Sequence, residues 1–111
     1  MSQEIETIEL NIKHAKKAVD LMKSVQRLTA NRDFKKVFLE GYFEQEAIRL
    51  VLLKSDPSLQ GAEDQAALIK QMDAIGSVRQ YLNTVNQLGR MAEKAISEDE
   101  ATRDELLAED L

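Results

Sequence analysis

The sequence predicts an all-α protein, and both its composition and its spacing of apolar residues support that class. Helix formers dominate, there are only four glycines and one proline among 111 residues, and no alternating pattern typical of strands occurs. Apolar residues recur instead at spacings of three and four, as in paired helices. A hydrophobic content of 43% suits one modest core. We therefore expect a single helical domain over residues 1–96, built as an elongated helical hairpin or a three-helix bundle with long, coiled-coil-like helices.

The first helix is predicted over about residues 3–29. Six apolar residues there follow spacings of 3, 4, 3, 4 and 3, the seam of a left-handed helix pair: Ile5, Ile8, Ile12, Ala15, Val19 and Met22. Residues 29–33 then interrupt the pattern. We expect Asn31 to end this helix in a left-handed conformation and Asp33 to cap the next one.

The second helix is predicted over about residues 34–54, with a wide apolar face. All three phenylalanines lie within ten residues, so this helix is expected to anchor the core through Phe34, Val37, Phe38, Tyr42, Ile48, Val51 and Leu52. A loop follows over residues 55–61, where Asp56 is a candidate N-cap and Pro57 suits a first helical position.

The third helix is predicted over about residues 62–96, with a heptad stripe at Ile75, Val78, Leu82, Val85, Gly89, Ala92 and Ile96. Gly76 and Gly89 are either weak points or sites of close helix approach. Ser97 and Glu100 match a capping box, which predicts that residues 97–111 form a separate acidic short helix or a tail.

The two heptad seams predict contacts with other protein chains. A helix over residues 62–96 is about 50 Å long, whereas a compact globule of this size, with a radius of gyration of roughly 13 Å, is only about 30 Å across. A shorter neighbour cannot cover such a stripe, so we expect a homo-oligomer or a larger protein assembly, with a monomeric bundle as the alternative. The predicted partner-binding residues are Ile5, Ile8, Ile12, Val19, Met22, Ile75, Val78, Leu82, Val85 and Ile96.

The net charge of −5 is distributed unevenly. Residues 97–111 hold seven acidic residues and one basic residue. A basic patch lies between residues 13 and 36, formed by Lys13, Lys16, Lys17, Lys23, Arg27, Arg32, Lys35 and Lys36. Such a run can neutralise phosphates, but it is also typical of a solvated face or of a surface that contacts an acidic tail.

No pattern in the sequence indicates catalysis, a cofactor or a metal site. There is no cysteine, and the one histidine, His14, follows Asn11 where a bundle metal site would place a glutamate. Glu46 and Arg49 form an i to i+3 pair without a nucleophile nearby. The acidic amino terminus and short aliphatic runs predict no secretory signal and no membrane contact, hence a cytoplasmic location.

One stretch resembles small helical proteins encoded by tailed bacteriophages among their virion and morphogenesis genes: NRDFKKVFLEGYF at 31–43 with EAIRLV at 46–51. The resemblance implies a virion component or assembly factor, in the host cytoplasm or the virion, and carries no active-site residues. Our first expectation is thus a non-enzymatic structural or assembly protein. The alternatives are a small regulatory protein that binds a host or viral nucleic-acid enzyme, and a weak nucleic-acid binder that uses the basic patch.

Overall fold

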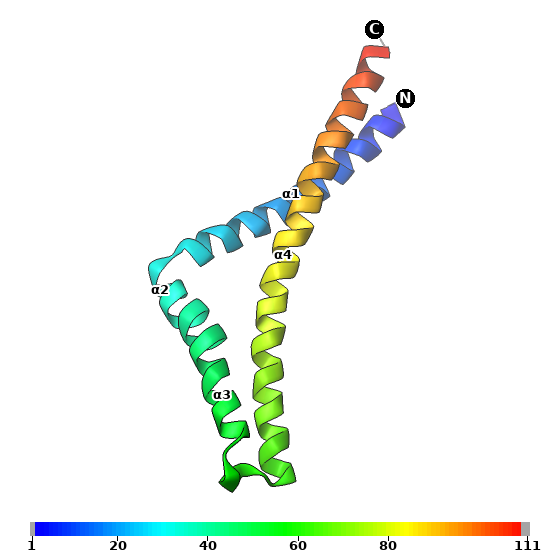
Figure 1. The fold of residues 1–111 in the computed structure, drawn as a ribbon. Helices are drawn as coiled ribbons and strands as arrows, with labels where there is room; N and C mark the ends of the chain where they lie inside the picture. Colours follow the sequence, from blue (N-terminus) through cyan, green and yellow to red (C-terminus); the bar gives the residue numbers. More distant parts are fainter. Residues whose placement is uncertain (1, 110–111) are drawn as a thin grey trace. The chain divides into compact units, whose positions relative to one another are not determined.

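The structure, a computed structural model, describes residues 2–109 and contains no strand among them, which confirms the all-α class. Figure 1 shows the helices in chain order. They are α1 (Ser2–Ala30), α2 (Arg32–Phe34), the π-helix η1 (Lys35–Glu46), α3 (Ala47–Lys54), the 3-10 turn η2 (Pro57–Leu59) and α4 (Ala62–Glu109).

Helix α1 agrees with its predicted limits to within one residue at each end, but the turn after it differs from expectation. Asn31 has extended backbone angles, φ −68° and ψ 131°, and its side chain accepts a hydrogen bond of 3.0 Å from the amide of Phe34. Asn31 is therefore the N-cap, and the predictions of a left-handed Asn31 and an Asp33 cap were wrong. An extended cap residue lets a short polar side chain reach the free amides of the first turn.

The second predicted helix has the expected extent but a different kind of backbone. Twelve of its residues, Lys35–Glu46, form a π-helix between the short α2 and α3. The π form has i to i+5 hydrogen bonds and is found mostly as single turns. Because a π turn takes up more residues than an α turn, side chains downstream are rotated relative to an α-helical prediction.

The loop before α4 was predicted correctly over residues 55–61. Asp56 accepts hydrogen bonds from the Ser58 amide at 2.8 Å and the Ser58 hydroxyl at 2.7 Å, and Pro57 occupies the first position of η2. Gln60 and Gln65 donate their side-chain amides to the carbonyl of Lys54 at 2.9 and 3.0 Å. These bonds give the last carbonyl of α3 two hydrogen-bond donors and hold the turn between α3 and α4 in place.

Helix α4 passes through Ser97 without a break, so the predicted separate helix or tail was wrong for residues 97–109. The glutamates, alanines and leucines of this stretch are strong helix formers and need no new start signal. Thr102 and Leu106 also line one hollow with Thr7 and Ile8, so the last turns of α4 lie next to α1. Residues 110–111 of the predicted tail lie outside the described residues.

The chain divides into two compact units, and the division does not fall at residue 96, where the sequence had suggested a boundary. We call Met1–Val25 with Thr84–Leu111 the terminal unit, of which residues 2–25 and 84–109 are described, and Gln26–Asn83 the hairpin unit. Each has its own cluster of buried side chains. Since neither cluster draws on three long helices, the hairpin alternative describes each unit better than a three-helix bundle.

In the terminal unit, α1 and α4 run antiparallel and pack closely. The buried cluster contains Val19, Met22 and Ala92, with Ala15, Ala18 and Ile96 packed against it. Gly89 lies so near Met22 that an added Cβ would fall 2.6 Å from Met22 Sδ and 2.8 Å from its Cγ. Gly89 is therefore a site of close helix approach, whereas Gly76 has nothing within 4 Å of an added Cβ.

In the hairpin unit, η1 and α3 pack against the first half of α4. Leu50, only 1% exposed, forms the buried cluster with Leu68 and Ile75. Five partly buried side chains pack around it: Tyr42, Phe43, Ala47, Leu53 and Met72. The sequence prediction had placed Ile48, Val51 and Leu52 in this core instead.

Candidate protein-binding surface

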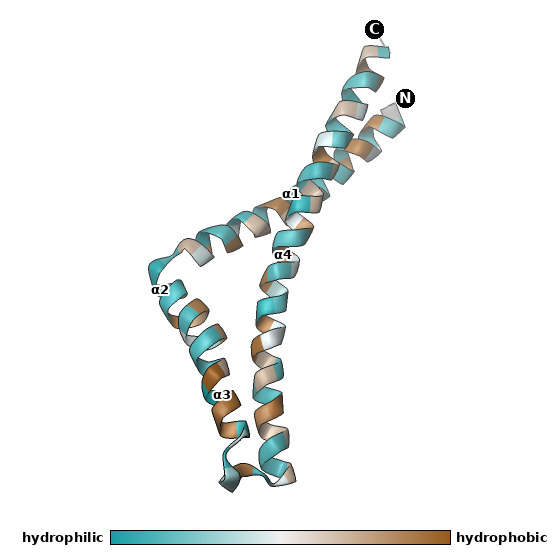
Figure 2. Ribbon diagram, in the orientation of Figure 1, coloured by the Kyte–Doolittle hydropathy of each residue, from teal (hydrophilic) through white to brown (hydrophobic). Residues whose placement is uncertain are grey.

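Helix α3 is apolar on its outer side as well as on its core side. Its sequence AIRLVLLK contains only two charged residues, and Figure 2 shows the ribbon of α3 coloured strongly hydrophobic. Leu50 points into the core, while Ile48, Val51 and Leu52 are 60%, 59% and 66% exposed. A helix that is hydrophobic all round is normally buried all round. The outer side of α3 is therefore apolar, as in a buried helix, although its side chains are exposed.

The π-helix explains why the predicted core residues lie outside. Residues four apart in an α-helix drift by about 40° around the axis, whereas in the wider π turn they lie almost in line. Phe34 and Phe38 accordingly stack with ring centroids 5.0 Å apart, and Phe38 meets Tyr42 edge-on at 6.1 Å. The same π-helix sets the phase at which the chain enters α3. The result is that Leu50, rather than Ile48 or Leu52, faces α4.

A largely apolar groove of about 470 Å³ runs beside this row, between η1 with α3 and the facing part of α4. It is lined by Val37, Phe38, Gly41, Tyr42, Glu46, Leu50, Gln71, Ala74 and Ile75. Val78 and Tyr81 follow Ala74 at i+4 and i+7, so they continue the same side of α4 and are also exposed. The groove and the outer side of α3 together form what we call the hairpin surface.

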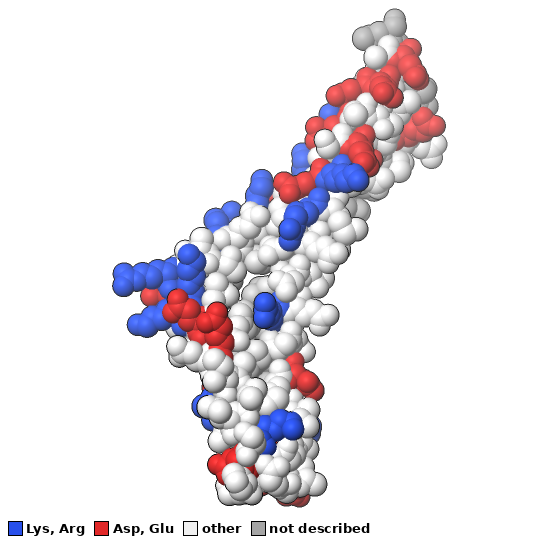
Figure 3. Space-filling model, viewed as in Figure 1, with Lys and Arg blue, Asp and Glu red and all other residues white. Residues whose placement is uncertain are grey.

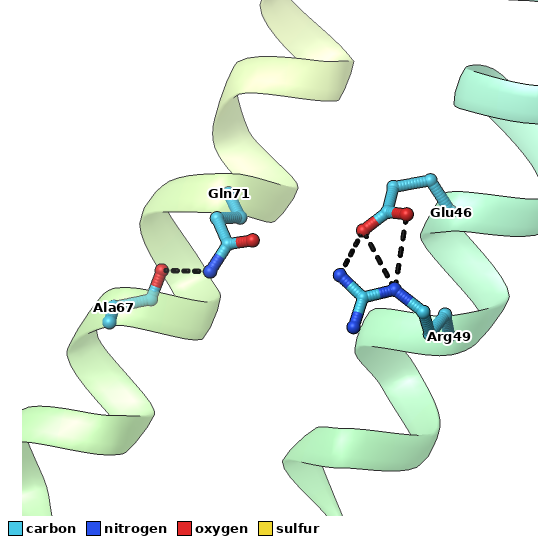
Figure 4. A network of polar contacts seen from close by, with 4 residues as sticks. All are labelled: Glu46, Arg49, Ala67 and Gln71. Carbon is cyan, nitrogen blue, oxygen red and sulfur yellow. Dashed lines mark hydrogen bonds and ion pairs between the residues drawn. The ribbon is translucent and has the colours of Figure 1, made fainter.

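The polar part of the groove is already internally paired. The Arg49 guanidinium donates through Nε to both carboxylate oxygens of Glu46, at 3.0 and 3.1 Å, as the i to i+3 spacing predicted. This hydrogen bond, more than the charge itself, lowers the pKa of Glu46 and raises that of Arg49. In Figure 4 Gln71 lies on the facing helix, where its side-chain amide donates to the carbonyl of Ala67. The groove thus offers little unpaired charge to a ligand.

The predicted basic patch is divided between the two units. Lys16 and Lys23 line a hollow of the terminal unit together with Glu93 and Glu100, so acidic residues of α4 lie near that half. Arg32, Lys35 and Lys36 belong to the hairpin unit and line a different hollow. Figure 3 shows the cationic side chains that gather around α2. The predicted patch therefore has residues in both units.

The predicted partner-binding seams are mostly covered within the chain itself. Five of their ten residues are buried, namely Ile12, Val19, Met22, Ile75 and Val85. Another four, Ile5, Ile8, Leu82 and Ile96, are half-buried, and Val78 alone among the ten is exposed. Val19 and Met22 form a buried cluster with Ala92, and Ile75 forms one with Leu50 and Leu68, while partner binding by the seams stays a prediction. No sequence signal marked the exposed side of α3, since its phase depends on the π-helix.

The described residues were also compared with the predictions about His14, metal sites and membrane spans. His14 is exposed on α1, as expected. Within residues 2–109, no group of three or more histidine, cysteine, aspartate or glutamate side chains is arranged to hold a metal ion. None of the helices in the same range combines the length and apolar character needed to cross a membrane.

Comparison of the chain with protein-family models, with curated proteins and with solved structures gave no match.

Proposed function

We propose that this chain is a non-enzymatic assembly protein that binds another protein chain through the hairpin surface. The observation that carries the proposal is the outer side of α3, where Ile48, Val51 and Leu52 are each about 60% exposed. Burying a side chain of this kind fully contributes roughly 1.5–3 kcal/mol, so covering the three of them favours association by several kcal/mol before its costs. An exposed apolar patch of this kind is typical of a protein interaction site.

The form of assembly that we propose is a virion or morphogenesis component of a tailed bacteriophage. The support for it is the resemblance of residues 31–43 and 46–51, which form α2, most of η1 and the first part of α3. The resembling stretch is thus the part of the chain that carries most of the hairpin surface, including Val37, Phe38 and Ile48.

The absence of cysteine allows a direct test of the proposal. Leu52→Cys introduces one thiol on the outer side of α3, and Gln80→Cys introduces a matched control. Gln80 is exposed and lies five residues from Ile75 and two from Val78, which places it about 140° around α4 from that core residue and on the opposite side from Val78. Each variant is labelled with a maleimide reagent, once as dilute purified protein and once in extract of the cells that naturally contain the protein.

We expect both thiols to react in the purified protein. In the extract, Leu52→Cys should be protected while Gln80→Cys stays reactive, because a partner covers the outer side of α3. Equal labelling of both variants in the extract would contradict the proposal. Cross-linking from position 52 followed by mass spectrometry then identifies the partner, for which capsid or tail proteins are the expected class.

A second candidate function, binding of a polyanion, is supported by the hollow that Arg32, Lys35 and Lys36 line in the hairpin unit. Contacts of this kind to phosphates weaken steeply with salt and carry no sequence preference. Lys35→Glu with Lys36→Glu should abolish binding of labelled single-stranded nucleic acid at low salt. Unchanged binding by this double variant would exclude the hollow as the site.

A further inference from the structure

We propose that the partner at the hairpin surface is a second copy of this chain, with two hairpin units packed antiparallel about a two-fold axis. This inference rests on the proposed function, because it names the partner of the same surface. It is carried by the balance and the placement of charge along the hairpin unit, together with the position of the uncovered apolar side chains.

The hairpin unit is electrically balanced. Residues 26–83 contain eight lysines and arginines and eight aspartates and glutamates, so their net charge is zero, whereas the whole chain carries −5. Two copies of this part can therefore approach without net repulsion, in contrast to the acidic residues 97–109 of α4. A surface that is apolar and without net charge suits a partner of the same kind.

The two ends of the hairpin unit carry opposite net charge. Residues 32–36, where α2 begins, hold Arg32, Lys35 and Lys36 with Asp33, a net charge of +2, and residues 54–64, around the loop between α3 and α4, hold Asp56, Glu63 and Asp64 with Lys54, a net charge of −2. A parallel pair of hairpins would place like charges together at both ends. An antiparallel pair places the cationic end of each copy beside the anionic end of the other, so that complementary charge fixes the orientation.

The same orientation matches the apolar side chains. When residues 35–36 of one copy lie near residues 54–56 of the other, Val37 of one copy lies near Leu52 of its partner. Val37 is 60% exposed and Leu52 is 66% exposed, and both belong to the hairpin surface. In a two-fold contact every such pair occurs twice, which doubles the apolar area that is covered. Ile48 lies between these two positions and also becomes covered.

Single cysteines test both the partner and its orientation. Val37→Cys and Leu52→Cys variants, distinguished by a small mass tag, are mixed in equal amounts and oxidised. We expect the mixed 37–52 disulfide to exceed the 37–37 and 52–52 products, because a disulfide requires Cα atoms within about 7 Å. Gln80→Cys should form no more dimer than random collision gives. Predominance of 37–37 and 52–52 products would overturn the antiparallel arrangement.

A charge exchange provides a second test at the ends. Lys35→Glu with Lys36→Glu should weaken the dimer about tenfold in sedimentation equilibrium at low salt, since each two-fold contact meets this change twice. Adding Glu63→Lys with Asp64→Lys in the same chain should restore most of the affinity. Failure of that rescue, with both variants folded by circular dichroism, would overturn the charge pairing.

The oligomeric state separates this inference from the proposed function. The wild-type chain should sediment as a dimer of twice 12.6 kDa at its highest soluble concentration. A 12.6 kDa monomer there would overturn the second copy as partner. If Leu52→Cys were still protected in the natural extract, the proposed function would stand with a different protein in place of the second copy.

Discussion

The terminal unit and the hairpin unit use helix pairs in opposite ways. In the terminal unit, small residues such as Ala15, Ala18 and Gly89 let α1 and α4 approach closely, and the heptad seam is covered. In the hairpin unit, a π-helix with a row of aromatic rings faces α4 and leaves a groove and an apolar outer side. The heptad seam of the first pair is therefore covered, whereas the second pair leaves Ile48, Val51 and Leu52 of α3 about 60% exposed. Helix pairing alone does not cover every apolar face.

The largest expected effect distinguishes the two sides of α3. Leu50→Ala should destabilise the fold by about 3 kcal/mol, because a fully buried leucine is replaced by a cavity. Leu52→Ala should change the stability of the unassociated chain by less than about 0.5 kcal/mol, since that side chain is exposed. Urea unfolding at low protein concentration measures both.

At high protein concentration Leu52→Ala should weaken association of the chain, because it removes part of the hairpin surface. A large loss of stability in Leu52→Ala at low concentration would show that the outer side is covered within the chain, and the contrast between the two units would be lost.

The second effect compares two glycines of the same helix. Gly89→Ala should destabilise by about 2 kcal/mol, because the new Cβ overlaps Met22 and the two helices must move apart. Gly76→Ala should stabilise by about 1 kcal/mol, because its added Cβ meets nothing and alanine is the better helix former. Thermal unfolding of the two variants should shift in opposite directions.

Substitutions at Met22 test whether its overlap with the new Cβ causes the loss of stability in Gly89→Ala. The Met22 atom nearest to the added Cβ is its own Cβ. Met22→Ala keeps that atom and should not relieve Gly89→Ala, whereas Met22→Gly removes it and should recover part of the loss. Stabilisation by Gly89→Ala would contradict the close approach of α1 and α4.

The smallest effect concerns the loop that closes the hairpin unit. The Ser58 hydroxyl, followed by the Ser58 amide, lowers the pKa of Asp56 below its ordinary 3.8. A lowered pKa in the folded state means that the carboxylate stabilises the fold above pH 3.8 and that this contribution is lost as the pH falls through the folded value. Asp56→Asn keeps an acceptor oxygen but has no such titration.

The stability difference between wild type and Asp56→Asn should therefore shrink in acid below pH 3.8, with little change near neutrality. Urea unfolding across this range provides the measurement. A difference that grew as the pH fell would show that the sign assigned to the Asp56 hydrogen bonds is wrong.

Several elements followed from the sequence with good accuracy. The limits of α1, the start of α4, the loop at residues 55–61 and the Asp56 cap were all predicted, because heptad spacing, proline and short polar caps act over a few neighbouring residues. The Glu46 and Arg49 pair followed from helical spacing for the same reason. The continuation of α4 beyond Ser97 did not follow, since a capping pattern inside a strong helix has no effect.

By itself, the sequence determined the helical class, most helix limits and the seam residues of α1 and α4, because these depend on the preferences and spacing of nearby residues. Only the tertiary structure decided which apolar side chains are covered. The seam at Val19 and Met22 is buried by residues some seventy positions away, and the phase of α3 is set by the twelve-residue π-helix before it. A change of helical phase moves Leu50 inward and Leu52 outward, although both are leucines on the same helix.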